Sequence, residues 1–243
     1  KEGLLFDGYY VAGNDEPVTS VAVGQIAEAS FSIGVVQTYT DIGGSGLNGT
    51  LLSNGTLALS GAASSGSFTL PDELKNDMRL HRISFEDVSG LHTFPAGAFA
   101  GSQLTDMIIP DTVTTLGPAL FLGCTRLREI TFPAAWGNDG VTIDCTDMLS
   151  GTTALETVTI DFCMADVIGG NGILRGAGRS VENGGLSVVF GQNAAFFGDR
   201  YLCANERITK VKVMAEDVQF GGCSFAEAAG LAVIDLAAVR TIA

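Results

Sequence analysis

Residues 104–133 read LTDMIIPDTVTTLGPALFLGCTRLREITFP, and this stretch contains one phrase twice. The phrase LTDMIIP at residues 104–110 returns as LREITFP at residues 127–133, so that Pro110 recurs as Pro133 with a period of 23 residues. In both copies a leucine is followed by apolar residues three and five positions later. A fixed period of this length predicts a stack of equivalent coils, because one unit cannot bury its apolar side alone.

Small and apolar residues also recur at fixed offsets between the two prolines. A period in the twenties with apolar residues at L-x-x-L-x-L spacing is typical of a leucine-rich-repeat solenoid. A strand that ends in Ile-Pro, followed by V-T-T-L-G, A-x-F and a cysteine, resembles the BspA-like leucine-rich repeats of bacterial cell-surface proteins. The residues that carry this resemblance are Pro110, Val113, Thr114, Leu116, Gly117, Ala119, Phe121, Cys124, Leu127, Ile130, Phe132 and Pro133.

The chain departs from the better-known leucine-rich repeats at one position of the unit. Their ladder asparagine would fall near Ala135 or Thr112, and neither side chain can build that ladder of hydrogen bonds. The resemblance is therefore to the bacterial subfamily. It extends from about Leu80 to the C-terminus and is weakest over residues 161–200, where a glycine-rich stretch interrupts the phrases.

The repeat predicts a right-handed leucine-rich-repeat solenoid that is rich in β-strands and has short helical or 3-10 turns. Parallel strands stack at about 4.8 Å, so the strand phrases would form a ribbon on the order of 30 Å long. We expect Phe99, Phe121 and Phe225 to be buried at equivalent corners, and Leu104, Leu127, Leu155 and Leu231 to line one row of the core. The strand phrases are anchored at Leu80, Leu104, Leu127, Leu155, Leu186, Ile208 and Leu231.

The N-terminal part of the chain lacks the repeat, so we divide the chain into residues 1–55 and a solenoid of residues 56–243. Asp7-Gly8 indicates a hairpin turn, and Thr19–Ile26 and Ala29–Tyr39 alternate in the manner of strands. One interpretation is an irregular, β-rich cap, because an end coil of a solenoid exposes its core. The alternative is a separate ligand-binding module.

The charge of the chain excludes some classes of partner. The 243 residues carry a net charge of −14, from 27 acidic and 13 basic residues, and no basic cluster is present. Nucleic acids and anionic membranes need a positive face and are therefore not expected as partners. No run approaches the roughly 20 apolar residues of a membrane span. The chain begins at Lys1 without Met, and we expect a processed N-terminus, as after removal of a signal peptide.

The cysteines show no pattern of a metal site or of a redox motif. They are widely spaced without any C-x-x-C, and their odd number leaves at least one unpaired within the chain. Cys124 takes a corner position of the repeat, where cysteine acts as a small apolar residue. We expect all of them to be buried packing residues. They are Cys124, Cys145, Cys163, Cys203 and Cys223.

Candidate chemical motifs are each better explained by the repeat. Residues 170–176 approach G-x-G-x-x-G but are one residue too long, and no βαβ unit surrounds them. The acidic corner at residues 139–147 lacks the pattern of a calcium loop. His81 and His92 have no nucleophile placed beside them, and we interpret both as exposed polar residues of the repeat. The sequence therefore predicts no catalytic residue, no metal and no cofactor.

The resemblance implies a non-catalytic protein that is secreted or displayed at the cell surface, as a lipid-anchored or periplasm-exported bacterial protein. It would bind proteins, host extracellular-matrix components or glycans through its repeat surface, without a membrane span of its own. Two alternatives stay open: a spacer or scaffold that displays the N-terminal region, and an enzyme with a site between cap and solenoid. The sequence does not fix the oligomeric state.

A binding face would consist of the outward positions of the strand phrases. These positions are rich in Thr and poor in aromatic residues, which suits polar contacts or glycan binding, and suits an inert spacer equally well. The candidate binding residues are Arg128, Glu129, Thr131, Glu156, Thr157, Thr159, Lys210 and Lys212.

Overall fold

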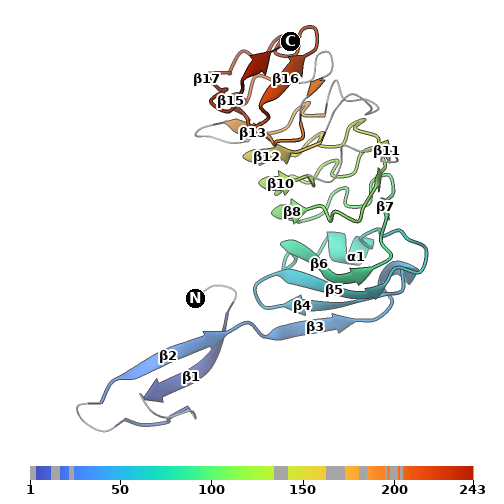
Figure 1. Ribbon diagram of the computed structural model, residues 1–243. Helices are drawn as coiled ribbons and strands as arrows, with labels where there is room; N and C mark the ends of the chain where they lie inside the picture. The colour runs from blue at the N-terminus through green and yellow to red at the C-terminus, as the bar shows by residue number, and fades with distance from the viewer. Residues whose placement is uncertain are drawn as a thin grey trace.

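The protein is elongated, with a two-stranded hairpin at one end, a four-stranded sheet next to it and a stack of coils beyond (Figure 1). The predicted fold class, a β-rich solenoid with little helix, is confirmed. The computed structural model describes residues 4–11, 17–21, 25–133, 142–162, 173–180, 185–194, 196–197, 202 and 205–242.

A six-stranded parallel sheet forms one side of the solenoid. Its strands follow one another in chain order, one from each coil, so that every coil hydrogen-bonds to the coils before and after it. Six of the seven phrases read from the sequence lie at these strands, and the phrase anchored at Leu80 lies at β6 (Arg82–Ser89), outside this sheet. In spatial order the strands are β8 (Asp106–Ile108), β10 (Glu129–Thr131), β12 (Thr157–Ile160), β13 (Leu186–Phe190), β15 (Ile208–Val213) and β17 (Val233–Asp235).

The opposite side of the solenoid is built from shorter strands in two parallel sheets of three strands each. A coil whose two sides are both described thus consists of a longer strand, a turn, a short strand and a corner that leads into the next coil. The first sheet contains β7 (Thr93–Phe94), β9 (Thr115–Leu116) and β11 (Thr142–Ile143), and the second contains β14 (Phe196–Phe197), β16 (Asp217–Phe220) and β18 (Thr241–Ile242).

Hydrogen bonds also join successive coils at their corners. Phe99 N donates to Leu120 O over 3.1 Å, and Phe121 N donates to Met148 O over 2.9 Å. Gly117 lies at a close approach of two backbones. A Cβ at this position would lie 2.4 Å from the backbone nitrogen of Ala96, so the coil contact requires glycine.

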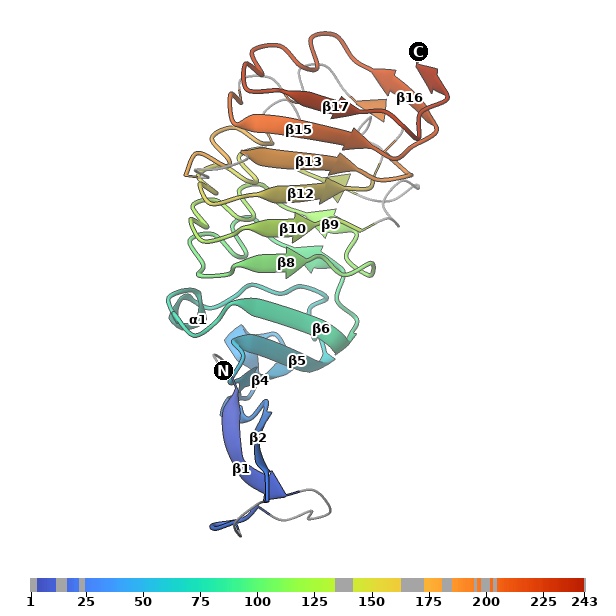
Figure 2. The same cartoon turned by 90° about the vertical axis from the view of Figure 1, so that its left-hand side faces the viewer.

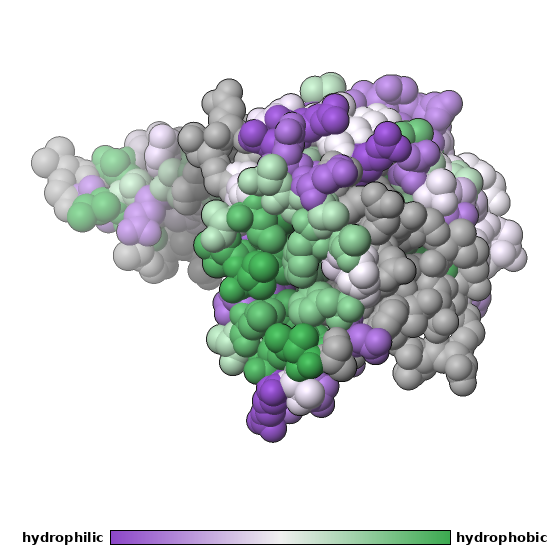
Figure 3. Space-filling model, turned by 90° about the horizontal axis from the view of Figure 1, so that it is seen from above, coloured by the Kyte–Doolittle hydropathy of each residue, from purple (hydrophilic) through white to green (hydrophobic). Residues whose placement is uncertain are grey.

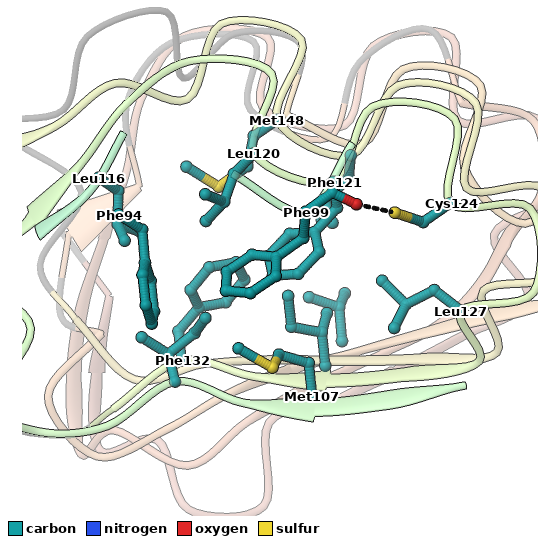
Figure 4. Packing of buried hydrophobic residues seen from close by; sticks show 14 of the residues in the cluster. Phe94, Phe99, Met107, Leu116, Leu120, Phe121, Cys124, Leu127, Phe132 and Met148 are labelled. Atoms are coloured by element: carbon teal, nitrogen blue, oxygen red, sulfur yellow. Dashed lines mark hydrogen bonds between the residues drawn. The ribbon is translucent and has the colours of Figure 1, made fainter. Parts of the chain in front are cut away.

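The core runs along the stack between the two sides of the solenoid (Figure 4). Phe99 and Phe121 are fully buried, as predicted, and their rings stack with centroids 5.3 Å apart. The predicted core row is confirmed at Leu104, Leu127 and Leu155, each of which is fully buried.

The predicted burial of Phe225 and Leu231 is wrong, because both are only partly buried. They belong to the last described coil, on which no further described coil stacks. Ile234 in this coil is 45% exposed. Apolar side chains gather on the end of the stack when it is viewed from above (Figure 3).

The described cysteines differ in their burial. Cys124 and Cys145 are buried packing residues, as predicted, whereas Cys223 is exposed. Cys223 has a φ of 58° and lies in a turn of the last part of the chain, next to the last described coil, on which no further described coil stacks. Cys163 and Cys203 lie outside the described residues.

A four-stranded sheet adjoins the first coil. Its strands are β3 (Val35–Tyr39), β4 (Leu47–Leu52), β5 (Thr56–Ala62) and β6 (Arg82–Ser89), and β5 pairs with β4 antiparallel but with β6 parallel. The predicted boundary between residues 55 and 56 falls in the turn between β4 and β5. Leu47 and Leu51 of β4 are fully buried in the common core. The division into two parts stays a prediction. The short helical elements here are η1 (Ile42–Gly44) and α1 (Asp72–Lys75).

The N-terminal hairpin consists of β1 (Leu5–Val11) and β2 (Ala27–Ser32). The turn predicted at Asp7-Gly8 is wrong: both residues lie inside β1, where the pairing register shifts between Phe6 and Gly8. The strand predicted over Ala29–Tyr39 is two strands, interrupted at Ile33 and Gly34. The strand predicted over Thr19–Ile26 is not found in the residues of that range that the structure describes.

Candidate functional site

The strands of the six-stranded sheet lie one above the other along one side of the stack (Figure 2), and we call the outward surface of this sheet the sheet face. Successive side chains of a strand point to opposite sides, so each strand buries one set and exposes the other. The register aligns the exposed sets of neighbouring strands. The first row contains Asp106, Glu129, Thr157, Ser187, Lys210 and Val233, and the second contains Ile108, Thr131, Thr159, Val189, Lys212 and Asp235.

All the predicted binding residues lie on or beside the sheet face. Six of them belong to the two rows, and Arg128 and Glu156 immediately precede β10 and β12. Glu156 N donates to Arg128 O over 2.8 Å, which places these two residues in neighbouring coils. Arg128, Glu129, Glu156 and Lys210 are exposed, whereas the three threonines and Lys212 are half-buried. Their role in binding stays a prediction.

A hollow of about 480 Å³, which we call the polar groove, lies where β8, β10 and β12 begin. It brings together four of the predicted residues but not Thr131, Thr159, Lys210 or Lys212. The lining residues are Arg82, Thr105, Asp106, Thr125, Arg126, Arg128, Glu129, Ala154, Glu156 and Thr157.

Two arginines of the polar groove are absent from the sequence-based candidates. Arg82 comes from β6, in the coil before β8, and its guanidinium forms an ion pair with the Asp106 carboxylate. Hydrogen bonding to Asp106, with a smaller contribution from the charge of Glu129, raises the pKa of Arg82. Arg126 comes from the corner that precedes β10. The sequence could have indicated Arg82, because it holds an outward position of the strand phrase at residues 80–85. No position of the repeat predicts Arg126, which lies in a corner.

The charges of the sheet face are unevenly paired. Arg128 Nε lies 3.9 Å from Glu156 Oε1, and the two side chains are 68% and 55% exposed. An exposed pair at this separation contributes little stability, so both groups can exchange this contact for one with a ligand. Among the described residues, Lys210 and Lys212 take part in no ion pair. The face therefore combines a charge-balanced groove with a separate pair of cations.

The buried cysteines are unsuited to nucleophilic chemistry. Cys124 Sγ donates to Phe99 O over 3.0 Å and lies 3.3 Å from Ser102 Oγ. Burial raises the pKa of both thiols, that of Cys145 to about 12. A thiol must ionise to act as a nucleophile or a metal ligand, so these two groups remain neutral packing residues near neutral pH.

The groups that metal binding would need are not clustered in the described residues. In that part of the chain, no set of three His, Cys, Asp or Glu side chains could hold a metal ion. His81 is half-buried and His92 is exposed, and each uses its backbone to join coils. No helix in the described ranges is long and apolar enough to cross a membrane.

The stacked coils, the parallel sheet and the hydrogen-bonded corners define a solenoid of the leucine-rich-repeat class. Residues 63–166 match the BspA type leucine rich repeat region in 6 copies. Those residues therefore carry BspA-type repeats, and the resemblance read from the sequence is confirmed there.

Two solved structures are similar to the chain, and a comparison with curated proteins found no match. The first is the pneumococcal vaccine antigen PcpA, with 14% identity, a TM-score of 0.34, and coverage of 84% of this chain and 70% of that one. The second is a leucine rich cell surface protein from Faecalibacterium prausnitzii A2-165, with 16% identity, a TM-score of 0.26, and coverage of 83% and 55%.

Proposed function

We propose that the protein is a non-catalytic binding protein, secreted or held at a bacterial cell surface, whose sheet face binds a protein or glycan ligand. The observation that carries this proposal is the sheet face itself. Side chains from six stacked strands form one continuous surface, on which Arg128 is weakly paired and, among the described residues, Lys210 and Lys212 form no ion pair. Solenoid folds use extended surfaces of this kind for recognition.

The sheet face is a rigid support for a ligand. Its strands are hydrogen-bonded to neighbours on both sides, and the inward residues Ile130, Val158 and Val211 are fully buried. A surface that is already ordered loses little conformational entropy when a ligand binds. The outward side chains can therefore contribute their contact energy without first ordering a loop.

The chemistry of the face favours a polar ligand, whose acidic groups would meet the cations of a surface that also carries carboxylates. Neither row contains an aromatic residue, and Ile108 is the most exposed apolar side chain in them, at 68%. Arg82, Arg126 and Arg128 line the polar groove. Arginine presents a planar fork of donors that matches carboxylates and similar anions. Lys210 and Lys212 add cationic contacts at a second point of the same surface.

Charge reversal tests the proposal. The variant Arg128→Glu/Lys210→Glu/Lys212→Glu should bind a confirmed ligand at least about tenfold more weakly, because opposed like charges lose more than about 1.4 kcal/mol. The ligand would first be found with an array of glycans and matrix proteins probed with the intact chain, and affinities would then be measured by surface plasmon resonance. Stability should change by no more than about 0.5 kcal/mol per exposed residue.

The control reverses three exposed cations that do not belong to the sheet face. Arg175→Glu/Arg179→Glu/Arg240→Glu changes the net charge by the same amount, and its affinity should stay within about twofold of the parent. Equal losses in both variants would show a general charge effect. If the sheet-face variant kept its affinity, the face would be the wrong site, and residues 1–55 would become the candidate binding module.

The spacer alternative is favoured by one feature of the same surface. Thr131, Thr157 and Thr159 are half-buried and offer few protruding groups to a partner. An array without any ligand would support the spacer. Catalysis would require turnover of a substrate by the purified chain, and the enzyme alternative would gain support if that turnover disappeared with His81→Ala.

A further inference from the structure

The hairpin of β1 and β2 is amphipathic. Directly paired residues share one side of the ribbon, so the pairs Phe6–Phe31 and Tyr9–Ala29 place their side chains on one side. The rings confirm this arrangement: Phe6 lies 5.2 Å from Tyr9 and 5.6 Å from Phe31 between centroids. We call this side the aromatic face of the hairpin.

The other side of the ribbon carries the polar contacts, beside Leu5, which pairs with Ser32. Asp7 accepts hydrogen bonds from Ser30 Oγ over 3.3 Å and from Ser32 Oγ over 2.6 Å. Tyr10 is paired with Glu28 on the same side. This alternation is the pattern of a strand pair with one side packed on a core and the other in water.

No described strand covers the aromatic face. Phe6 is 55% exposed and Tyr9 is 53% exposed. Within the described residues β1 pairs only with β2, and the hairpin projects away from the solenoid (Figures 1 and 2). Its base is attached at Gly34, whose nitrogen lies 3.0 Å from Ser53 Oγ. An isolated two-stranded hairpin is at best marginally stable in water, so a partner on this face would stabilise it.

The charge around the hairpin disfavours an anionic membrane as that partner. No Lys or Arg occurs between Glu2 and Leu74, whereas Asp7 and Glu28 are acidic. Attachment to anionic lipid requires basic residues close to the apolar contact. A neutral, flat and apolar face is instead complementary to a second copy of itself.

The exposed area is large enough for such a contact. The apolar residues that follow β2 at the same alternate positions are also exposed, with Ile33 at 51% and Val35 at 61%. Together with the aromatic rings they leave on the order of 500 Å² of apolar surface open on each copy. Two copies would bury roughly 1,000 Å² in total, which is the size at which a specific interface becomes credible.

We propose that the aromatic face joins two copies of the chain, hairpin against hairpin, in an isologous dimer. The two ribbons stack as layers about 10 Å apart, with Phe6, Tyr9 and Phe31 of each copy between them. The same surface is used on both copies, as two-fold symmetry requires. In each copy the hairpin projects away from the solenoid (Figure 1), which would limit repulsion between the two acidic bodies.

A matched pair of lysine substitutions tests the dimer. Ala29→Lys places a charge in the aromatic face, and Ser30→Lys places the same charge on the polar side at the next position. Sedimentation velocity of the intact chain from about 1 to about 100 µM spans the weaker affinities expected for an interface of this size. The parent and Ser30→Lys should shift from 25.1 kDa toward twice that mass, and Ala29→Lys should associate at least about tenfold more weakly.

Three results would overturn the proposal. The first is a parent chain that stays monomeric over the whole range. The second is an Ala29→Lys variant that dimerises as well as the parent, which would assign the contact to another surface such as the exposed last coil. The third is monomeric protein that floats with neutral phosphatidylcholine vesicles through the same residue, which would identify a lipid surface as the partner. Unchanged far-UV circular dichroism and melting temperature would show that both variants are folded.

Discussion

At the scale of single residues, the stability of the protein depends on aromatic rings at the corners of the coils. Phe94, Phe99 and Phe121 are fully buried and in ring contact, with centroids 4.9 Å apart for the first pair and 5.3 Å for the second. Phe99 and Phe121 come from successive corners and Phe94 comes from β7 in the same coil as Phe99, and together the rings fill the space between the two sides of the stack (Figure 4). Their positions followed from the repeat, because equivalent positions in successive units stack on one another.

The first prediction concerns Phe121. Phe121→Ala should lower the free energy of unfolding by about 3–5 kcal/mol, because it removes a large side chain from a close-packed core. The adjacent Leu122 is 42% exposed, and Leu122→Ala should cost less than about 1 kcal/mol. Urea titration of both variants checks this. A loss below about 1 kcal/mol for Phe121→Ala would contradict the observed packing.

The second prediction concerns Cys145, whose burial raises its pKa from 9.0 to about 12. Above pH 9 the thiol ionises in the unfolded chain but not in the folded protein, so the unfolded state binds fewer protons. The contribution of this thiol to the free energy of unfolding is fully present below pH 9 and is lost as the pH rises toward 12. Between pH 8 and pH 10 the parent should lose about 1 kcal/mol more than Cys145→Ala, measured by urea titration at each pH. Equal losses would contradict the prediction.

At the scale of elements, the corners set how closely the coils approach. Gly117 and Gly101 both lie at corners, but for different reasons. A Cβ on Gly117 would lie 2.8 Å from the carbonyl carbon of Pro95, whereas a Cβ on Gly101 would meet nothing within 4 Å. Gly101 instead has a φ of 71°, which strains residues with a side chain.

The third prediction concerns these two glycines and belongs to the scale of elements. Gly117→Ala should cost about 3 kcal/mol or more, because backbone must move to admit the methyl group. Gly101→Ala should cost about 1 kcal/mol, the strain of the left-handed conformation alone. Thermal and urea unfolding of both variants measure the difference. Similar costs for the two would mean that the coils can separate at Gly117 without loss.

The elements themselves were predictable where the repeat is regular and less so elsewhere. The phrases at residues 104–110 and 127–133 contain β8 and β10, because apolar spacing is a local property of the chain. In the hairpin, the dipeptide Asp7-Gly8 predicts a turn. Both residues instead lie inside β1, where the pairing with β2 shifts its register. Gly34 interrupts an otherwise continuous alternation by bonding to Ser53, a contact that no local pattern contains.

At the scale of the whole molecule, the sheet face was predictable but the polar groove was not. The outward positions follow from alternation within each strand, which is why the predicted residues lie on one surface. The groove depends on which residues of different coils are neighbours. Arg82 meets Asp106, and Arg126 lies nearby at a corner, only because of the register between coils of unequal length.

The projecting hairpin has a consequence for proteolysis. Proteases with trypsin-like specificity recognise a cationic residue through an acidic specificity pocket. Lys1 is followed by no Lys or Arg until Lys75, so such an enzyme finds no cleavable bond in the hairpin or in β3, β4 and β5. A protruding hairpin would ordinarily be an early target for digestion. Here the exposed arm is open to enzymes that cut at aromatic residues, such as Phe6 and Tyr9, and closed to those that cut at basic ones.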